Sequence, residues 1–366
     1  MRKRWPIALV AVLVGAVSPP ACGPVPAGGG AAHEASRLDV RFVVDEPEAV
    51  LDILDAMARG EEVGSAAWAR LFATEGYRRL KEREASLNRA FTDDEFGSFV
   101  RSPALAERRT ELRRTLERWR SVDMAEPARL AFRYLPEGAA IRAAVYPSIK
   151  PRTNSFVFEP RTNPAIFLYL DPAKPAAALT NTVAHELHHI GLAGACGDPD
   201  PGLPKGVRDA LDWMGGFGEG LAMLAAAGGA DTHPHATSPS EARAVWDSAV
   251  ARVPADLARL ERFFLDLVDG RMTEEEAATR GFRFLVDDGV PQGAFYTVGW
   301  HMAALVEREL GRERVVAGVC DPAVLLADYD RAAAAVGART GRRLPRWSGT
   351  LLEAVGAGSA VEQGVR

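Results

Sequence analysis

The feature that most constrains this chain is a run of five residues, His185 to His189, with the sequence His-Glu-Leu-His-His. His185 and His189 are four residues apart, so an α-helix places both imidazoles on one face, one turn from each other. Two imidazoles at that spacing can bind one tetrahedral zinc ion, and Glu186 projects toward the same side. The pattern is expected by chance only about 0.01 times in a chain of this composition. The sequence therefore predicts a zinc-binding helix, over about residues 176–192.

Glu186 gives this motif a chemistry beyond metal binding. A bound zinc ion lowers the pKa of its water toward neutrality, and a carboxylate beside that water can take its proton as the oxygen attacks a carbonyl. A structural zinc site needs ligands and no base, and it is normally closed by four protein ligands. The motif therefore favours a hydrolase in which Glu186 is the general base that activates a zinc-bound water.

A catalytic zinc usually has three protein ligands and one open position, so a third ligand must lie elsewhere in the chain. The metzincin pattern continues with Gly and then His after the second ligand, but Leu192 and Ala195 occupy those positions. Glu219 is the best candidate further on, because a carboxylate that opens an apolar run is costly to bury unless it is paired or bound to metal. Other residues stay open as alternatives: Asp198, Asp200, Asp212, His233 and His235.

Glycines surround Glu219, but they do not form a phosphate-binding loop. The segment from Gly216 to Leu221 lacks the third glycine of the dinucleotide fingerprint, and no βαβ pattern surrounds it. The glycines instead predict a close approach of two helices near the metal. His188 lies about 60° off the face of the two ligand histidines, so we predict that it supports the ligands or the fold rather than binding the metal.

Together, the His185-to-His189 motif and the segment Glu219-Gly220-Leu221-Ala222 resemble the gluzincin clan of metallopeptidases. More narrowly, the chain is similar to a bacterial family described as "putative zinc-dependent peptidases" of unknown function, a likeness that spans most of the mature chain. The resemblance implies a thermolysin-like core with zinc held by His185, His189 and Glu219. One departure is Met223, which stands four residues after the Glu where the clan has Asp to support a zinc ligand. Further segments carry the likeness: Trp68-Ala69-Arg70-Leu71, Gly76-Tyr77 and Tyr296 to Ala303.

The resemblance also implies a donor that stabilises the oxyanion as the carbonyl becomes tetrahedral, since gluzincins generally supply a Tyr or a His for this purpose. Tyr296 and His301 are the two candidates, at the start of an apolar run that follows a glycine-containing loop. Zincin folds also bind the substrate backbone along an edge strand of their sheet. By that analogy, we expect Ile166 to Leu170 to be the edge strand.

The pattern of apolar residues predicts an α+β chain that is mostly helical. Residues 38–135 are expected to form an N-terminal helical region, with helix starts at the capping box of Thr92 and Glu95 and at Ser102 before Pro103. Residues 136–366 are expected to form the zincin-like region. Its short β-like runs predict a small antiparallel sheet before the motif helix, from the segments Ile141 to Val145, Phe156 to Phe158 and Ile166 to Leu170.

Residues 1–22 have the pattern of a bacterial export signal, with a basic start and an apolar block from Ile7 to Val17. The block is shorter than the ~20 residues of a membrane-spanning helix. Cys22 stands where a lipoprotein signal places its acylated cysteine, and the Gly/Pro/Ala-rich residues 23–37 would form a flexible tether. Pro19 occupies the position where an aliphatic residue is usual, so cleavage and release of the protein is the alternative.

These features predict zinc-dependent hydrolysis of peptide bonds outside the cytoplasm, by a periplasmic or cell-envelope lipoprotein or a secreted enzyme that acts on a peptide or protein. Two alternatives stay open: an exported scaffold with a structural zinc, and a zinc amidase that acts on a non-peptide amide. The net charge of −5, without a basic stripe, argues against a nucleic-acid partner. If Cys22 carries lipid, Cys196 and Cys320 remain as an even pair in a compartment where disulfides persist.

Overall fold

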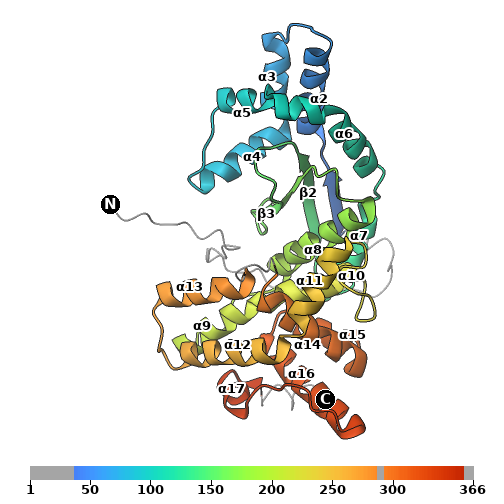
Figure 1. Ribbon diagram of the computed structural model, residues 1–366. Coiled ribbons are helices and arrows are strands. Elements are labelled where there is room, and N and C mark those ends of the chain that lie inside the picture. Colours follow the sequence, from blue (N-terminus) through green and yellow to red (C-terminus); the bar gives the residue numbers. More distant parts are fainter. Residues whose placement is uncertain (1–36, 287–291, 358–366) are drawn as a thin grey trace, which may run out of the picture. The chain divides into compact units, whose positions relative to one another are not determined.

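A computed structural model describes residues 37–286 and 292–357, which form two compact units (Figure 1). Unit 1 combines the residues up to 124 with residues 142–174, and unit 2 combines residues 125–141 with those from 175 onward. The expected export signal, Cys22 and the tether up to residue 36 lie outside the described residues. In the ranges that are described, no helix is both long enough and apolar enough to cross a membrane. The predicted class, α+β and mostly helical, is confirmed.

Unit 1 starts with a strand, continues through helices and returns to strands. Two of its helices begin where the sequence predicts. Thr92 Oγ1 accepts a hydrogen bond from Glu95 N at 3.1 Å while the Glu95 carboxylate accepts one from Thr92 N at 2.6 Å, and Ser102 caps the helix that opens with Pro103. The elements are β1 (Leu38–Phe42), α2 (Asp45–Ala58), α3 (Ser65–Ala73), α4 (Glu75–Ser86), α5 (Asp93–Val100), α6 (Pro103–Arg120), β2 (Ile141–Ser148), β3 (Phe156–Phe158) and β4 (Ala165–Tyr169).

The sheet of unit 1 is mixed, which corrects the antiparallel prediction. Its strand order is β1-β2-β4-β3, with β2 and β4 parallel and β3 and β4 antiparallel. β4 therefore lies inside the sheet, so the expectation that Ile166 to Leu170 is an edge strand is wrong. The physical reason is its pairing: Ala165 and Ile166 have partners in both β2 and β3, and Ala165 to Leu168 are buried without alternation, as in a strand covered on both faces. Short apolar runs alone do not show which neighbours a strand has.

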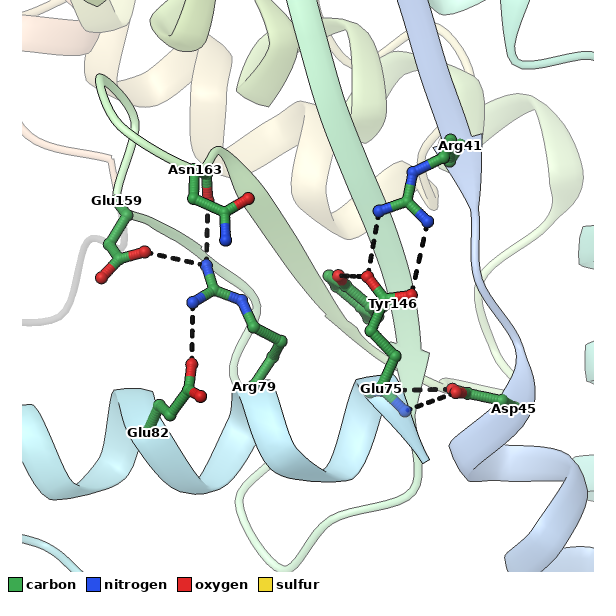
Figure 2. Close-up of polar contacts among 9 residues, drawn as sticks. Arg41, Asp45, Glu75, Arg79, Glu82, Tyr146, Glu159 and Asn163 are labelled. Carbon is green, nitrogen blue, oxygen red and sulfur yellow. Dashed lines mark hydrogen bonds and ion pairs between the residues drawn. The ribbon is translucent and has the colours of Figure 1, made fainter. Parts of the chain in front are cut away.

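Helix α4 is joined to the sheet through charged side chains (Figure 2). Asp45 accepts hydrogen bonds from the backbone N–H groups of Glu75 and Gly76, at 2.6 and 3.2 Å, and so caps the start of α4. Arg79, one turn further on, donates to the Glu159 carboxylate at 3.0 Å and to the Asn163 carbonyl at 2.9 Å. Both acceptors lie in the turn between β3 and β4, so one arginine fixes that turn against the helix.

Unit 2 is built from helices around one apolar core. Phe217, Phe263, Phe264 and Phe295 are all at most 1% exposed, and their rings contact one another and Trp347 in edge-on or tilted arrangements. The elements are α7 (Ala125–Phe132), α8 (Ala176–Ala195), α9 (Lys205–Met214), the short 3₁₀ helix η1 (Gly215–Phe217), α10 (Gly218–Ala227), α11 (Ser240–Val250), α12 (Val253–Val268), α13 (Glu274–Leu285), α14 (Ala294–Leu310), α15 (Arg312–Gly318), α16 (Pro322–Thr340) and α17 (Gly349–Ala354).

Helix α8 carries the His-Glu-Leu-His-His motif and packs against α7 and α10, while α10 packs in turn on α14. The crossing of α10 and α14 is a backbone contact. A Cβ atom at Gly220 would lie 2.0 Å from the backbone nitrogen of Trp300 and 2.4 Å from the carbonyl carbon of Gly299. The predicted close approach of two helices at these glycines is confirmed, and it brings the first turn of α10 next to α14.

A disulfide bond joins Cys196, at the C-terminal end of α8, to Cys320, between α15 and α16. The two cysteines are 124 residues apart in sequence, and their Cα atoms are 5.1 Å apart. The bond therefore closes a large loop of unit 2 that contains α9 to α15. It also fixes the end of the helix that carries the histidine motif.

Candidate metal centre

Helices α8 and α10 bring three potential metal ligands together. His185 and His189 lie one turn apart on α8, and Glu219 lies in the first turn of α10. The Nε2 atoms of the two histidines are 3.0 Å apart, and each is 3.1 Å from Oε2 of Glu219. Among the described residues, these three form the group of His, Cys, Asp and Glu side chains found to be close enough to share a metal ion.

The spacing of these atoms fits a zinc ion. Zinc–ligand distances of about 2.0–2.2 Å place the ligand atoms of a tetrahedral site roughly 3.3–3.6 Å apart. The observed 3.0–3.1 Å is a few tenths of an ångström shorter. The three side chains keep 14–18% of their surface exposed. The cluster thus has a face that water and a substrate can reach, as a catalytic site with an open position requires.

The electrostatics of the cluster also suit a cation. Burial raises the pKa of the Glu219 carboxyl, but the charge of His189 and hydrogen bonds from both imidazoles hold that pKa well below its usual range. Burial lowers the pKa of His189, yet Glu219 and Glu186 raise it to about 9. The protein therefore stabilises a positive charge between two imidazoles and a carboxylate. A divalent metal can replace the proton that supplies this charge, because imidazole binds metals in its neutral form.

Glu186 lies close enough to this cluster to act on it electrostatically. Its charge contributes to the raised pKa of His189 and to the raised pKa of Tyr296. His189 is one of the three candidate ligands and lies on α8, and Tyr296 lies beside them on α14. The Glu186 carboxylate therefore acts electrostatically on the same small region that the three candidate ligands define.

Tyr296 and His301, the two candidate oxyanion donors, lie in different surroundings. The ring of Tyr296 is parallel to that of His185, with centroids 6.1 Å apart, and burial together with a hydrogen bond to Glu219 raises the pKa of its hydroxyl. His301 instead faces Tyr329, with ring centroids 5.9 Å apart, and burial lowers its pKa to about 4. Five residues of helix turn the chain by about 140°, so only Tyr296 is directed to the cluster.

His188, between the two ligand histidines in sequence, is fully buried and faces away from them. Its Nε2 lies 3.3 Å from the carbonyl oxygen of Tyr134, and burial lowers its pKa to about 3. As a neutral imidazole it can donate a hydrogen bond to that carbonyl. The structure thus agrees with the prediction that His188 supports the fold rather than the metal. Tyr134 itself has no recognisable sequence signal, because its contact to α8 runs through the backbone.

The alternative third ligands do not join the cluster in the described residues. His233 is paired with Asp247 at 2.9 Å, and His235 faces Gln292 at 2.8 Å. The acidic alternatives, Asp198, Asp200 and Asp212, are likewise outside the metal-binding group. Glu219 is therefore the carboxylate that the geometry supports.

The support of the ligands departs from the usual pattern at His185. Metal-binding histidines almost always donate their other ring N–H to a carboxylate, a carbonyl or a water. Nδ1 of His185 is buried and has no protein partner among the described residues. Met223, at the position where an Asp was expected, instead receives the Gln292 amide on its sulfur at 3.5 Å. The unpaired nitrogen agrees with the loss of the carboxylate that the sequence indicated.

Comparison with known families agrees with this geometry. Residues 68–337 match a family model described as "Putative zinc dependent peptidase (DUF5700)", and the match includes α8, α10 and α14. The chain belongs to this family. No curated protein and no solved structure matches the chain. The predicted resemblance is confirmed, and the zinc named in the family's description agrees with the His185, His189 and Glu219 cluster.

Proposed function

We propose that this family member is an exported zinc metallopeptidase that hydrolyses peptide bonds. The observation that carries the proposal is the convergence of His185, His189 and Glu219, whose ligand atoms lie within 3.0–3.1 Å of one another. The Glu186 carboxylate and the Tyr296 hydroxyl, which are not among the three ligands, lie beside them. The three ligands leave a position open for substrate chemistry. When bound, zinc supplies a Lewis acid that polarises the scissile carbonyl and makes water nucleophilic near neutral pH.

Glu186 is the general base in this proposal. Its carboxylate takes the proton of the attacking water and then transfers it to the nitrogen of the departing amine. The position of Glu186 supports this role, since its charge acts on both His189 and Tyr296. The residue has no other role evident in the fold, because no hydrogen bond to another described side chain accounts for it.

Tyr296 is the proposed donor to the oxyanion. Burial and the neighbouring carboxylates raise the pKa of its hydroxyl, so the group keeps its proton at neutral pH and can donate it in a hydrogen bond. Its present contact with Glu219 places the hydroxyl beside the ligands. A donor aimed at the carbonyl oxygen stabilises the negative charge that develops as water adds. His301 has no comparable contact with the ligands.

Export of the protein is supported by the N-terminal pattern and by the Cys196–Cys320 disulfide, since such bonds persist in oxidising compartments. We propose that the mature chain is tethered to the cell envelope through a lipid on Cys22. Membrane fractions should then retain the parent protein and lose the Cys22→Ala variant. Release of both proteins into the soluble fraction would show ordinary cleavage instead.

The decisive experiment combines a metal assay with peptide cleavage. Mature protein purified without chelators should contain about one zinc per chain and should cleave members of a diverse peptide library until a chelator is added. Glu186→Gln should keep the zinc and lower kcat/KM by about 10²–10⁴-fold. His233→Gln, which changes a histidine outside the cluster, is the matched control and should keep both zinc and activity.

Three outcomes would contradict the proposal. Zinc well below one per chain would remove the metal centre, and parental activity in Glu186→Gln would remove the base. Stoichiometric zinc with no cleavage of any peptide would leave a zinc-binding protein of another function. In that case, tests on non-peptide amides separate an amidase from a scaffold.

A further inference from the structure

Tyr134, whose carbonyl oxygen contacts His188, belongs to a series of contacts that joins α8, α10 and α14. Tyr134 follows α7, and its carbonyl oxygen lies 3.3 Å from Nε2 of His188 in the middle of α8. The next residue, Leu135, packs on α8 so closely that a Cβ atom at Gly191 would lie 2.2 Å from its Cδ1 atom. The backbone carbonyl of Tyr134 and the side chain of Leu135 therefore both contact the part of α8 that carries the metal ligands.

The side chain of Tyr134 continues the connection to α14. Its hydroxyl donates a hydrogen bond to Oε1 of Glu307 at 2.8 Å. The other carboxylate oxygen of Glu307 accepts a hydrogen bond from the backbone N–H of Ala230, also at 2.8 Å. Ala230 lies just after α10, beyond two glycines, Gly228 and Gly229, that have positive φ angles of 82° and 142°. One carboxylate thus joins the segment behind α8 to the end of α10.

These contacts connect the helices that carry the proposed active site. α8 provides His185 and His189, α10 provides Glu219, and α14 provides both Glu307 and Tyr296. We propose that Tyr134 and Glu307 are positioning residues, which hold α8 and α10 at the separation that the metal centre needs. The inference rests on the proposed zinc function of the three ligands. Neither residue contacts a ligand, so each acts through the helices.

A rigid helix can transmit such a constraint. α10 has ten residues, so its length is about 15 Å, and a shift at its C-terminal end moves Glu219 at its first turn. Metal sites tolerate displacements of only about 0.5 Å before their geometry is lost. Tyr134 is 1% exposed, so packing fixes the position of its ring, while its partner Glu307 is partly buried. The Tyr134–Glu307 hydrogen bond therefore starts from a side chain that cannot move freely, and it can act as a spacer between the helices.

The variants Tyr134→Phe, Glu307→Gln and Glu307→Ala test this inference. Zinc affinity is measured by competition with a chelator of known affinity, together with the midpoint of thermal unfolding of the metal-free protein. Tyr134→Phe should weaken zinc binding by about tenfold, in the range found for residues that support metal ligands. Glu307→Ala should weaken it at least as much, and Glu307→Gln, which keeps one acceptor oxygen, should recover part of the loss.

A matched control separates positioning from general stability. Tyr329 is equally buried in unit 2, and its hydroxyl donates to the carbonyl of Pro345 at 2.6 Å, a hydrogen bond that involves neither α8 nor α10. Tyr329→Phe should lower the unfolding midpoint about as much as Tyr134→Phe and leave zinc affinity within twofold of the parent value. If Tyr134→Phe also stays within twofold, or if Tyr329→Phe weakens zinc binding equally, the inference is wrong.

The design gives an answer even if one variant does not fold. Arg308 donates to the Ala230 carbonyl and pairs with Asp231, so the end of α10 keeps a second tie to α14 when Glu307 is changed. Should Glu307→Ala nevertheless not fold, Tyr134→Phe decides alone. Because the readout is zinc affinity, it is independent of cleavage. A protein that binds zinc but cuts no peptide would overturn the proposed function and still leave this inference open to the same comparison.

Discussion

Two regions of the molecule, the contact of β1 with α4 in unit 1 and the surroundings of the proposed site in unit 2, are held by contacts of different kinds. In the first region the contact is made by long charged side chains near solvent: Arg41 and Glu75 form a pair (Figure 2), and their side chains are 56% and 38% exposed. In unit 2 the contacts that surround the proposed site are short and buried, such as the approach of Gly220 to the backbone of Trp300. The disulfide of Cys196 and Cys320 adds a covalent constraint to unit 2.

This difference indicates which substitutions should affect the stability of the protein little and which should affect it strongly. Exposed ion pairs contribute little to the free energy of unfolding, because water and salt screen the charges and the long side chains lose conformational entropy when they are held in one geometry. Backbone contacts between helices and buried hydrogen bonds cannot be remade by a neighbouring group, so each one fixes a distance. We therefore expect substitutions to have small effects at the exposed pair of Arg41 and Glu75 in unit 1 and large effects at the buried contacts around the proposed site in unit 2.

The largest expected effect is loss of the disulfide. In the chain-entropy model, a bond that closes a loop of this length stabilises a protein by about 4–5 kcal/mol. The Cys196→Ser/Cys320→Ser variant should therefore unfold at a clearly lower urea concentration than the parent. Unfolding of the parent in the presence of a reductant should reproduce the shift. Coincident urea midpoints for oxidised parent and double variant would contradict the prediction and remove the covalent part of the comparison.

The second effect concerns the crossing of α10 and α14. Gly220→Ala puts a methyl group 2.0 Å from the nitrogen of Trp300, where backbone on both sides leaves nothing flexible to move. We expect a loss of about 3 kcal/mol in the free energy of unfolding, measured by urea denaturation, with weaker zinc binding because Glu219 is adjacent.

Gly194→Ala is the matched control for that substitution. Gly194 also lies in a helix of unit 2, near the end of α8, and a Cβ atom there would meet nothing within 4 Å. Since Ala has the higher helix propensity, we expect a gain of up to about 1 kcal/mol. Equal losses in both variants would show that glycine itself, and not the helix crossing, matters at position 220.

A smaller and pH-dependent effect is expected at His301. Burial lowers its pKa in the folded protein to about 4, while in the unfolded chain His protonates near pH 6.5. Between these pH values the unfolded chain binds more protons, so the free energy of unfolding falls as the pH falls. His301→Leu should remove this contribution, which is at most about 1.4 kcal/mol per pH unit.

The His301 variant also bears on catalysis. Urea denaturation at pH 7 and pH 5 measures the pH effect, and peptide cleavage at pH 7 measures the role in activity. Between pH 7 and pH 5, we expect the free energy of unfolding to fall less in His301→Leu than in the parent. The variant should also keep the cleavage activity of the parent. A loss of cleavage with zinc retained would instead assign His301, rather than Tyr296, to the oxyanion.

The sequence predicts the centre of the site better than its surroundings, for a physical reason. His185, Glu186 and His189 lie within one turn of helix, so their spacing alone specifies their geometry. Glu219 could be selected because an unpaired carboxylate in an apolar run is costly to bury. The Tyr134–Glu307 contact spans 173 residues and involves common residue types, so nothing local in the sequence indicates it.

The sheet also shows that contacts between distant segments are difficult to predict from sequence. The runs that form β2, β3 and β4 are apolar enough to predict strands, but pairing is decided by contacts between segments. β4 became an interior strand because β2 and β3 lie on either side of it, and the sequence of β4 alone is compatible with either position. The sequence therefore predicts that each of these strands exists, whereas only the structure shows their order and direction.

The smallest expected effect concerns the exposed pair of Arg41 and Glu75 in unit 1. Arg41 donates to both oxygens of the Glu75 carboxylate, at 2.9 and 3.3 Å, and lowers the pKa of that carboxyl. Glu75 also accepts a hydrogen bond from the Tyr146 hydroxyl at 2.7 Å, so it keeps a partner when Arg41 is removed.

Arg41→Ala should accordingly lower the free energy of unfolding by only about 0.5 kcal/mol. The loss should shrink further at 1 M salt, where the Debye length is about 3 Å. A double-mutant cycle with Glu75→Gln, measured by urea denaturation at low and high salt, isolates the pair from its neighbours. A coupling energy above about 2 kcal/mol that does not respond to salt would mean that this exposed pair holds β1 and α4 as firmly as buried contacts hold unit 2. The contrast between the two regions would then rest on the disulfide and on the close approach of α10 and α14 at Gly220 alone.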